Sequence, residues 1–486
     1  MKQNVLVIGA GLSGLVTAKT LLEYGYSVTV FEKDPEIGGV WASSRRYPGL
    51  TIQNTRDTYA FSDFPMPRDY PEFPSGAQML SYLKAYAAHF GIDRVIRTGH
   101  SVERAGLDTS GARPKWTLSG QAGGQPFEAE GDWLVVCNGT FSEPAIPDYP
   151  GMDVFKQNGG MILHTSTAGR PEYYRGKKVA VVGFGKSACD IASAIAPDTA
   201  HTYLVYRQAK WKVPKRIRGV NYKYIILTRF GEALTKLRYR NGVERLIHAL
   251  KIPQRLLRFM QNTFSAQQQL QAAGLEPELP ITDMLHGELS VESDGFYQQV
   301  LDGKITAVKG EISAFSATGI EVPGAGSLTV DTVILGTGFT QTLPFFSNDL
   351  RTALTDAEGN FLLYRNILPP TLPALAFVGY NSSFFCTLTS EMAALWLCEY
   401  LEGRIALPAP GTQLELIREH LAWRKQFRQN ALYKNASVYP FNLTYVDWLL
   451  KDMNARLPLP ALLSEWLVVV DPGHYAGVKR KIMQRS

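Results

Sequence analysis

The chain has 486 residues, of which 45% are hydrophobic and 19% are charged, and this composition is typical of a globular protein that is too long for a single core. Its net charge of +6 comes from 50 basic and 44 acidic residues, and no nucleic-acid partner is expected. No apolar run reaches the length of a membrane span and the first predicted strand begins at Asn4, so we expect a cytoplasmic enzyme of two or three domains.

The first predicted element is a buried strand that runs into a glycine-rich turn and a helix, in the segment VLVIGAGLSGLVTA. Gly9 allows a tight turn, Gly11 lets the backbone approach a pyrophosphate, and Gly14 allows the helix to pack closely on the strand. Glu32 ends the next predicted strand, where a carboxylate accepts hydrogen bonds from a ribose. The spacing therefore predicts a dinucleotide site.

A second unit of the same kind occurs in VAVVGFGKSACDIA. The following strand ends in Arg207, and a cation at this place suits a 2'-phosphate, which predicts FAD in the first unit and NADPH in the second. A solvated surface arginine is the alternative for Arg207. The residues expected to hold the second pyrophosphate at the start of the helix are Gly183, Gly185, Lys186, Ser187 and Ala188.

Basic residues interleaved with apolar ones follow Arg207, as in WKVPKRIRGVNYKYIILTRF. This pattern favours a helical insertion at about 209–290 with a solvated basic face. A peripheral contact with a membrane or a protein through this insertion stays open as the alternative, and so does a homo-oligomer.

Cysteines and histidines exclude two classes of site. The four cysteines are Cys137, Cys189, Cys386 and Cys398, and none forms the closely spaced pair that a disulfide reductase places beside its flavin. The eight histidines show no metal-binding spacing, so no metal is expected. Reducing equivalents are therefore expected to pass to oxygen or to an organic acceptor.

Five further motifs are GGVW (38–41), QNTRDTYAFSDFP (53–65), GGMILHTS (159–166), VILGTGF (333–339) and LAFVGY (375–380). Together with the two fingerprints they resemble the flavin-containing monooxygenase family, a group of class B flavoprotein monooxygenases. GFGKSACDIA is most similar to the plant-type and microbial branches of this family. The resemblance implies cofactor contacts at Gly39, Trp41, Thr337 and Gly338 in addition to the two fingerprints.

The resemblance and the two fingerprints together imply an α/β fold with two Rossmann-like domains, the NADPH domain being inserted into the FAD domain. We expect a first FAD segment at 1–150, an NADPH domain at 151–327 and a second FAD segment with C-terminal helices at 328–486. The chain is expected to return to the FAD sheet at VDTVILGTGF.

The family's chemistry implies that reduced flavin and O2 form a C4a-hydroperoxide that oxygenates a nitrogen or sulfur atom of a small organic substrate. Asn54 is expected to support this species, with a turn cap as its alternative role, and His164 is expected either to organise the NADPH domain or to be a structural residue.

Three departures from the family pattern bear on the substrate: Asn158 and Ala168 replace aromatic residues, and Gly336 replaces an alanine. Ala168 argues against a Baeyer-Villiger enzyme acting on a ketone, although the segment RYPG (46–49) resembles such enzymes. Baeyer-Villiger oxidation, an uncoupled NADPH oxidase or reductase, and a redox-sensing flavoprotein stay open.

Overall fold

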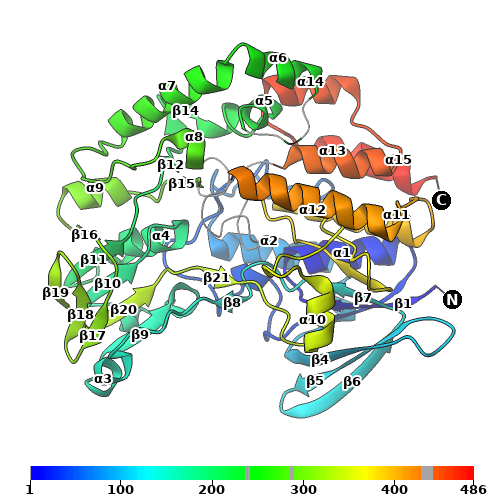
Figure 1. The fold of residues 1–486 in the computed structure, drawn as a ribbon, viewed down its shortest axis with the longest axis horizontal. Helices are drawn as coiled ribbons and strands as arrows, with labels where there is room; N and C mark the ends of the chain where they lie inside the picture. Colours follow the sequence, from blue (N-terminus) through cyan, green and yellow to red (C-terminus); the bar gives the residue numbers. More distant parts are fainter. Residues whose placement is uncertain (1, 236–237, 239–240, 285–288, 428–441, 486) are drawn as a thin grey trace.

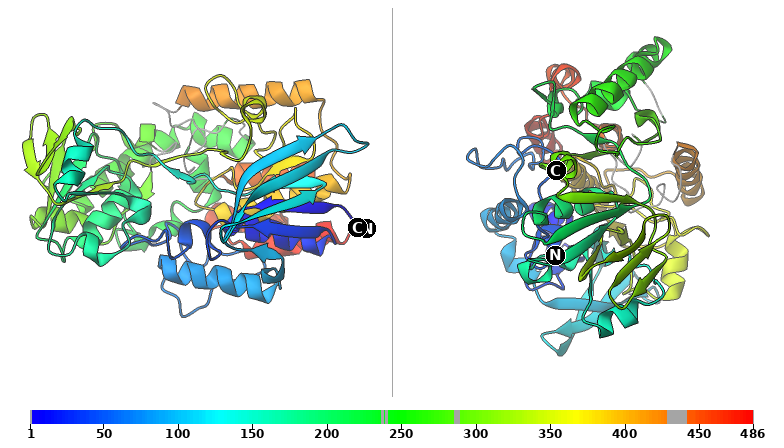
Figure 2. Two further views of the ribbon diagram at one scale, coloured as in Figure 1. Left: turned by 90° about the horizontal axis from the view of Figure 1, so that it is seen from below. Right: turned by 90° about the vertical axis from the view of Figure 1, so that its left-hand side faces the viewer.

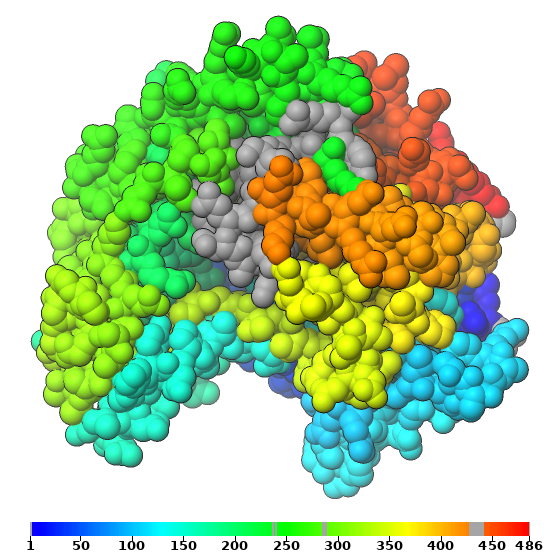
Figure 3. Space-filling view, viewed as in Figure 1, coloured from blue at the N-terminus to red at the C-terminus, as the bar shows by residue number. Residues whose placement is uncertain are grey.

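The computed structural model describes residues 2–235, 238, 241–284, 289–427 and 442–485. Two parallel β-sheets form the centres of two lobes, and both termini lie at the end of the lobe that holds the first sheet (Figures 1 and 2). Helices from the middle and the end of the chain form the upper part of the molecule in Figure 1. The space-filling view shows a notch between the lower ends of the two lobes (Figure 3).

The first sheet consists, in spatial order, of β22 (Leu375–Phe377), β7 (Trp133–Val136), β1 (Asn4–Ile8), β2 (Ser27–Phe31) and β3 (Ile96–Arg97), all parallel. β1 is an almost continuous apolar run because a parallel sheet is covered on both faces. One cover is α1 (Leu12–Glu23), which connects β1 to β2 and packs against α11 (Cys386–Leu401).

Two further elements complete this lobe. α2 (Gly76–His89) begins at a capping box in which Ser75 and Gln78 satisfy each other's backbone N–H groups. An antiparallel meander of β4 (His100–Asp108), β5 (Lys115–Ala122) and β6 (Gln125–Gly131) projects from the first sheet.

The second sheet consists of β16 (Ile305–Lys309), β11 (His201–Tyr206), β10 (Lys178–Val182), β20 (Thr332–Leu335) and β9 (Met161–His164), again all parallel. α4 (Lys186–Ile195) connects β10 to β11 in the way that α1 connects β1 to β2. Smaller elements of this lobe are α3 (Met152–Gln157), α9 (Phe296–Leu301), β17 (Ala314–Ser316), β18 (Gly319–Val322) and β19 (Gly326–Thr329).

The expectation that the chain returns to the first sheet at VDTVILGTGF is wrong. This segment forms β20, which pairs with β10 and β9 of the second sheet, and the first sheet receives its last strand only at β22. Both segments are short apolar runs, so their composition does not decide which sheet they join. The lobes are linked by the antiparallel pair of β8 (Glu143–Pro144) and β21 (Phe339–Thr340), so the chain leaves and re-enters the first lobe at adjacent points.

Helices make up most of the regular structure of the insertion after β11, and short strands lie at both of its ends. Its elements are β12 (Lys212–Val213), β13 (Arg216–Ile217), β14 (Val220–Asn221), α5 (Arg229–Ala233), α6 (Gly242–Ala249), α7 (Ile252–Gln267), α8 (Ile281–Met284) and β15 (Ser290–Val291). Besides α11, the last part of the chain contributes α10 (Asn348–Leu354), α12 (Pro410–Phe427), α13 (Leu443–Asp452), α14 (Leu459–Leu467) and α15 (Gly473–Met483).

A buried arginine joins the insertion to the C-terminal helices. Arg229 of α5 donates to Glu465 of α14 at 2.9 Å and to both carboxylate oxygens of Asp447 of α13 at 2.7 and 3.0 Å. None of the helices in the described part of the chain combines the length and the apolar character that a membrane span requires.

Candidate functional site

One cavity, of about 660 Å³, lies at the carboxyl ends of the strands of both sheets and is lined by residues of both glycine-rich turns. Ligands of open α/β sheets bind at this edge. The predicted site residues that line the cavity are Gly9, Gly11, Glu32, Gly39, Trp41, Asn54, Gly185, Lys186, Ser187, Ala188 and Gly338. Gly14, His164, Gly183, Arg207 and Thr337 do not line it.

The first glycine-rich turn has the steric properties that a pyrophosphate cradle needs. Gly9 has φ +102°, and a Cβ atom there would lie 2.6 Å from the carbonyl oxygen of Cys137. A Cβ atom on Gly14 would lie 1.9 Å from the carbonyl oxygen of Gly9. At Gly11, in contrast, the nearest atom would be the Cα atom of Gly39 at 3.6 Å. Gly9 and Gly14 therefore allow close contacts between backbone segments, whereas Gly11 leaves space that a ligand can fill.

Glu32 directly follows β2 and lines the cavity, and its role as a ribose acceptor stays a prediction. Its two carboxylate oxygens accept hydrogen bonds from the backbone N–H groups of Ala10, at 2.7 Å, and of Asp34, at 3.0 Å. Burial raises the pKa of Glu32, and the two N–H groups oppose this rise. Each oxygen has further lone pairs for a ligand hydroxyl.

The second glycine-rich turn repeats this geometry. Gly183 has φ +116°, and a Cβ atom there would lie 2.6 Å from the carbonyl oxygen of Gly336, whereas a Cβ atom on Gly185 would meet nothing within 4 Å. Lys186 at the start of α4 donates to Asp190 at 2.5 Å, and Ser187 donates to the hydroxyl of Tyr47 at 3.1 Å. Both turns thus fit a dinucleotide, because the second glycine of each leaves room beside a helix N-terminus.

Arg207 follows the last residue of β11, as predicted for a residue that reads the 2'-phosphate. Its side chain is 78% exposed, and its guanidinium lies 3.7 Å from the carboxylate of Glu311. It lies outside the cavity lining, so its role in binding NADPH stays a prediction.

Asn54 is buried in the cavity wall, and hydrogen bonds fix its amide. Its Nδ2 atom donates to the carbonyl oxygen of Phe384 at 2.7 Å. Its Oδ1 atom accepts from the backbone N–H of Thr55 at 2.8 Å and from the hydroxyl of Thr58. The oxygen therefore caps the 55–58 turn, while one N–H of the amide is not used by Phe384.

His164 lies at the end of β9 and connects two parts of the cavity wall. Its Nδ1 atom accepts from the backbone N–H of Ser166 at 3.2 Å, and its Nε2 atom donates to the carbonyl oxygen of Gly338 at 2.9 Å. Burial lowers the pKa of His164, and the charge of Arg45 lowers it further, against the effect of the Gly338 hydrogen bond. Both causes favour the neutral form of the ring, and its two hydrogen bonds give His164 the geometry of a positioning residue.

Thr337 and Gly338 lie in the segment that leads from β20 into β21. The hydroxyl of Thr337 donates to the carbonyl oxygen of Ala145 at 2.5 Å and so anchors the link between the lobes. Gly338 has φ +87° and reaches the cavity.

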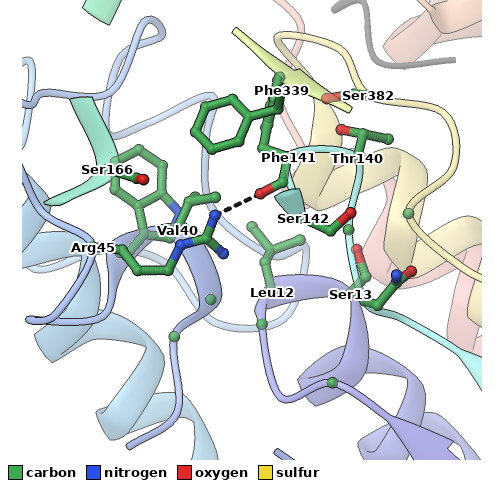
Figure 4. Close-up of a pocket in the computed structure, with 18 of the residues that line it drawn as sticks. Leu12, Ser13, Val40, Arg45, Thr140, Phe141, Ser142, Ser166, Phe339 and Ser382 are labelled. Atoms are coloured by element: carbon green, nitrogen blue, oxygen red, sulfur yellow. Dashed lines mark hydrogen bonds between the residues drawn. The ribbon is translucent and has the colours of Figure 1, made fainter. Parts of the chain in front are cut away.

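Arg45 is a cavity residue that the sequence did not single out. Its guanidinium donates to the carbonyl oxygen of Phe141 at 2.5 Å and lies 5.9 Å from the ring centroid of Phe339 (Figure 4). Within the described part of the chain, no carboxylate lies within ion-pair distance of it. A charged guanidinium at the cavity can hold an anionic group such as a diphosphate. The sequence signal that could have identified Arg45 as a site residue is its position directly before the RYPG segment.

The segment 382–386 was also missed, although it follows the last strand of the first sheet. Ser382, Ser383, Phe384 and Cys386 line the cavity. The rule that ligands bind beyond the carboxyl ends of parallel strands could have found it. Among the described residues, no group of three or more histidine, cysteine, aspartate or glutamate side chains is arranged to hold a metal ion.

Comparison with known proteins agrees with this geometry. The N-oxide-forming dimethylaniline monooxygenase 2 of Cavia porcellus is 27% identical over 528 residues, covering 100% of this chain and 92% of the relative. The solved S-allyl-L-cysteine S-oxygenase of Allium sativum has a TM-score of 0.64 and 20% identity over 100% of this chain and 99% of its own. A steroid monooxygenase bound to NADP has a TM-score of 0.68 and 19% identity over 93% and 97% of the two chains.

The match to a protein family covers almost the whole chain. Residues 2–474 match the family described as flavin-binding monooxygenase-like. The chain therefore belongs to this family and is a flavin-dependent monooxygenase.

Proposed function

We propose that the protein uses FAD, NADPH and O2 to transfer one oxygen atom to a nitrogen or sulfur nucleophile of a small organic substrate. NADPH, a proton and O2 would be consumed, and the oxygenated substrate, NADP+ and water would be formed. The observation that carries the proposal is that both glycine-rich turns open into one cavity with the Asn54 amide in its wall.

We assign the first turn, with Glu32, to FAD and the second turn, with Arg207, to NADPH. The steroid monooxygenase of similar fold binds NADP, which supports this pairing. We keep the proposed boundary between the first FAD segment and the NADPH domain at residue 150. The boundary between the NADPH domain and the second FAD segment moves from residue 327 to beyond Leu335, because β20 belongs to the second sheet.

Bound flavin supplies the oxygen-transfer chemistry, and NADPH supplies the two electrons. The protein's own contribution is to hold both cofactors in one cavity and to limit access of water to it. Asn54 presents a neutral N–H donor at a fixed orientation, and Trp41 and Phe384 contribute apolar surface to the wall.

Oxygenation of a heteroatom is favoured over Baeyer-Villiger oxidation by two observations. The names of two similar proteins describe N-oxide formation and S-oxygenation. The RYPG segment has a structural role that does not depend on a ketone substrate: a Cβ atom on Gly49 would lie 2.8 Å from the carbonyl oxygen of Asp190, so this loop packs directly on α4.

The test is product analysis with ¹⁸O2. The purified enzyme with NADPH is given a tertiary amine, a thioether and a cyclic ketone, and NADPH consumption, H2O2 release and ¹⁸O in each product are measured. An ¹⁸O-labelled N-oxide or sulfoxide is the expected product. A labelled lactone alone, or H2O2 equal to the NADPH consumed with every substrate, would contradict the proposal.

A further inference from the structure

Exposed apolar side chains are concentrated on three helices at one end of the molecule. α6, α7 and α14 lie along the same rim, at the top of Figure 1 and at the top of the right-hand view in Figure 2. Leu467 is 83% exposed and Leu459 is 65% exposed. The exposed large apolar residues of these helices and their ends are Val243, Leu246, Leu250, Phe259, Leu459, Leu463, Leu467 and Val468.

The apolar residues follow the helical period, and polar contacts on the opposite side hold the helices in place. Leu459, Leu463 and Leu467 are spaced by four and form one stripe on α14. On the other side of this helix, the buried Glu465 pairs with Arg229 of α5. α6 is also attached to α5, through a hydrogen bond of 2.8 Å from His248 to the carbonyl oxygen of Ala233. α5 therefore anchors both helices and leaves their apolar stripes exposed.

Positive charge borders the apolar stripes, and the three helices contain only two acidic residues, Glu244 of α6 and the buried Glu465 of α14. The segment 245–275 contains four basic residues and no aspartate or glutamate. Lys251, Arg255 and Arg258 are exposed, and none of them makes an ion pair with a described residue. Arg255 and Arg258 share a helical face with Phe259, whose ring lies 4.9 Å below the guanidinium of Arg218.

We propose that this rim, formed by α6, α7 and α14, docks the protein on the surface of a lipid bilayer with anionic headgroups. Leucine and phenylalanine side chains bordered by lysine and arginine are the composition of helices that lie in the membrane interface. The rim of helices is convex in outline (Figure 3), a shape that suits a deformable lipid surface better than a protein groove. The basic residues that border the stripes match the negative charge of anionic lipid headgroups.

The experiment is sedimentation of the full-length protein with vesicles of phosphatidylcholine alone and of phosphatidylcholine with about one third phosphatidylglycerol. The protein is expected to bind the anionic vesicles and to be released as salt screens the charges. The double variant Leu463→Ser with Leu467→Ser is expected to bind roughly tenfold more weakly. The triple variant Lys251→Gln, Arg255→Gln and Arg258→Gln is expected to lose roughly 100-fold on anionic vesicles.

Matched controls change the same numbers of exposed residues elsewhere. Ile146→Ser with Val154→Ser removes two exposed apolar side chains, and Arg104→Gln with Arg113→Gln and Lys115→Gln removes three charges from the β4–β6 meander. Both controls are expected to bind as the parent does. Failure of the folded parent to bind anionic vesicles overturns the proposal, and so does an equal loss in the controls. A parent dimer that the Leu463→Ser and Leu467→Ser variant converts to a monomer also overturns it, because the rim is then an interface between copies.

Discussion

Ala188 and Gly336 share a space that holds only one methyl group: a Cβ atom on Gly336 would lie 2.7 Å from the Cβ atom of Ala188. The first unit differs: a Cβ atom on Gly14 would lie 3.6 Å from the Cβ atom of Cys137, an ordinary contact, but 1.9 Å from the carbonyl oxygen of Gly9. Residue 336 is an alanine in the flavin-containing monooxygenase pattern and a glycine here. The missing methyl group makes room for Ala188, which occupies the third position of the second fingerprint.

Gly336→Ala should therefore lower the free energy of unfolding by about 1 to 3 kcal/mol, the usual cost of overpacking. Adding Ala188→Gly should restore part of this loss, although a Cβ atom at 336 would also lie 2.7 Å from the carbonyl oxygen of Val182. Denaturant unfolding of the parent, both single variants and the double variant gives the coupling energy. Strictly additive effects would show that the two residues do not share this space.

The glycine-rich units were predictable because their spacing is local: the turn, the strand before it and the helix after it follow one another in the sequence. The sheet to which β20 belongs was not predictable, since several segments offer equally apolar strands. The cavity wall formed by Arg45 and Phe384 was missed for a related reason. These residues come together only when the 40–54 segment, β21 and the start of α11 meet.

Gly11→Val and Gly185→Val should separate the two cofactors. Gly11 has φ −74° and Gly185 has φ −70°, values that valine adopts without strain, so both variants should fold. The added side chains would project into the cavity. Gly11→Val should lower FAD occupancy by roughly tenfold or more, whereas Gly185→Val should keep FAD and weaken NADPH. Flavin absorbance and NADPH titration measure the two effects. Full FAD content in Gly11→Val would exclude the first turn as the FAD site.

Arg207→Ala should weaken NADPH binding by about tenfold and leave NADH nearly unchanged, because a charge-assisted contact with the 2'-phosphate is lost. The side chain is exposed, so solvent screening places the expected effect at the lower end of the range for such contacts. The kcat/KM values for both cofactors test this, with the exposed Arg175→Ala as the matched control. Equal losses for NADPH and NADH would mean that the ion pair with Glu311 is structural.

Stability should depend on pH through Glu232 on α5. Burial raises the pKa of its carboxyl group to about 7, although the N–H of Thr444 and the charge of Arg229 oppose this rise. Between the usual pKa of 4.5 and about 7, the folded protein holds a proton that the unfolded chain has lost. The free energy of unfolding therefore falls as pH rises through this window, by up to about 3 kcal/mol.

Glu232→Gln removes this ionisation and keeps an acceptor for Thr444. The variant should be more stable than the parent at pH 8, and the difference should disappear near pH 4.5. Unfolding midpoints across this range provide the measurement. A difference that does not change with pH would rule out the titration of Glu232 as its cause.

Asn54→Ala should uncouple NADPH consumption from product formation. Hydride transfer depends on the nicotinamide site, so its rate should stay close to that of the parent. The cavity, however, loses the amide of Asn54, which Phe384 holds through one N–H and whose other N–H is available as a donor. Loss of one such hydrogen bond, about 1 to 3 kcal/mol, corresponds to roughly one to two decades in a rate. Oxygenated product should therefore fall and H2O2 release should rise at nearly constant NADPH consumption.

Asn54→Asp distinguishes this role from that of a turn cap. Aspartate keeps the oxygen that accepts from Thr55 and Thr58 but has no N–H to donate to Phe384 or into the cavity. If the N–H donor matters, Asn54→Asp should release as much H2O2 as Asn54→Ala, although it keeps both acceptor contacts of the turn cap. A coupled Asn54→Asp enzyme would show instead that the side chain only caps the turn, because the acceptor alone would then be sufficient for function.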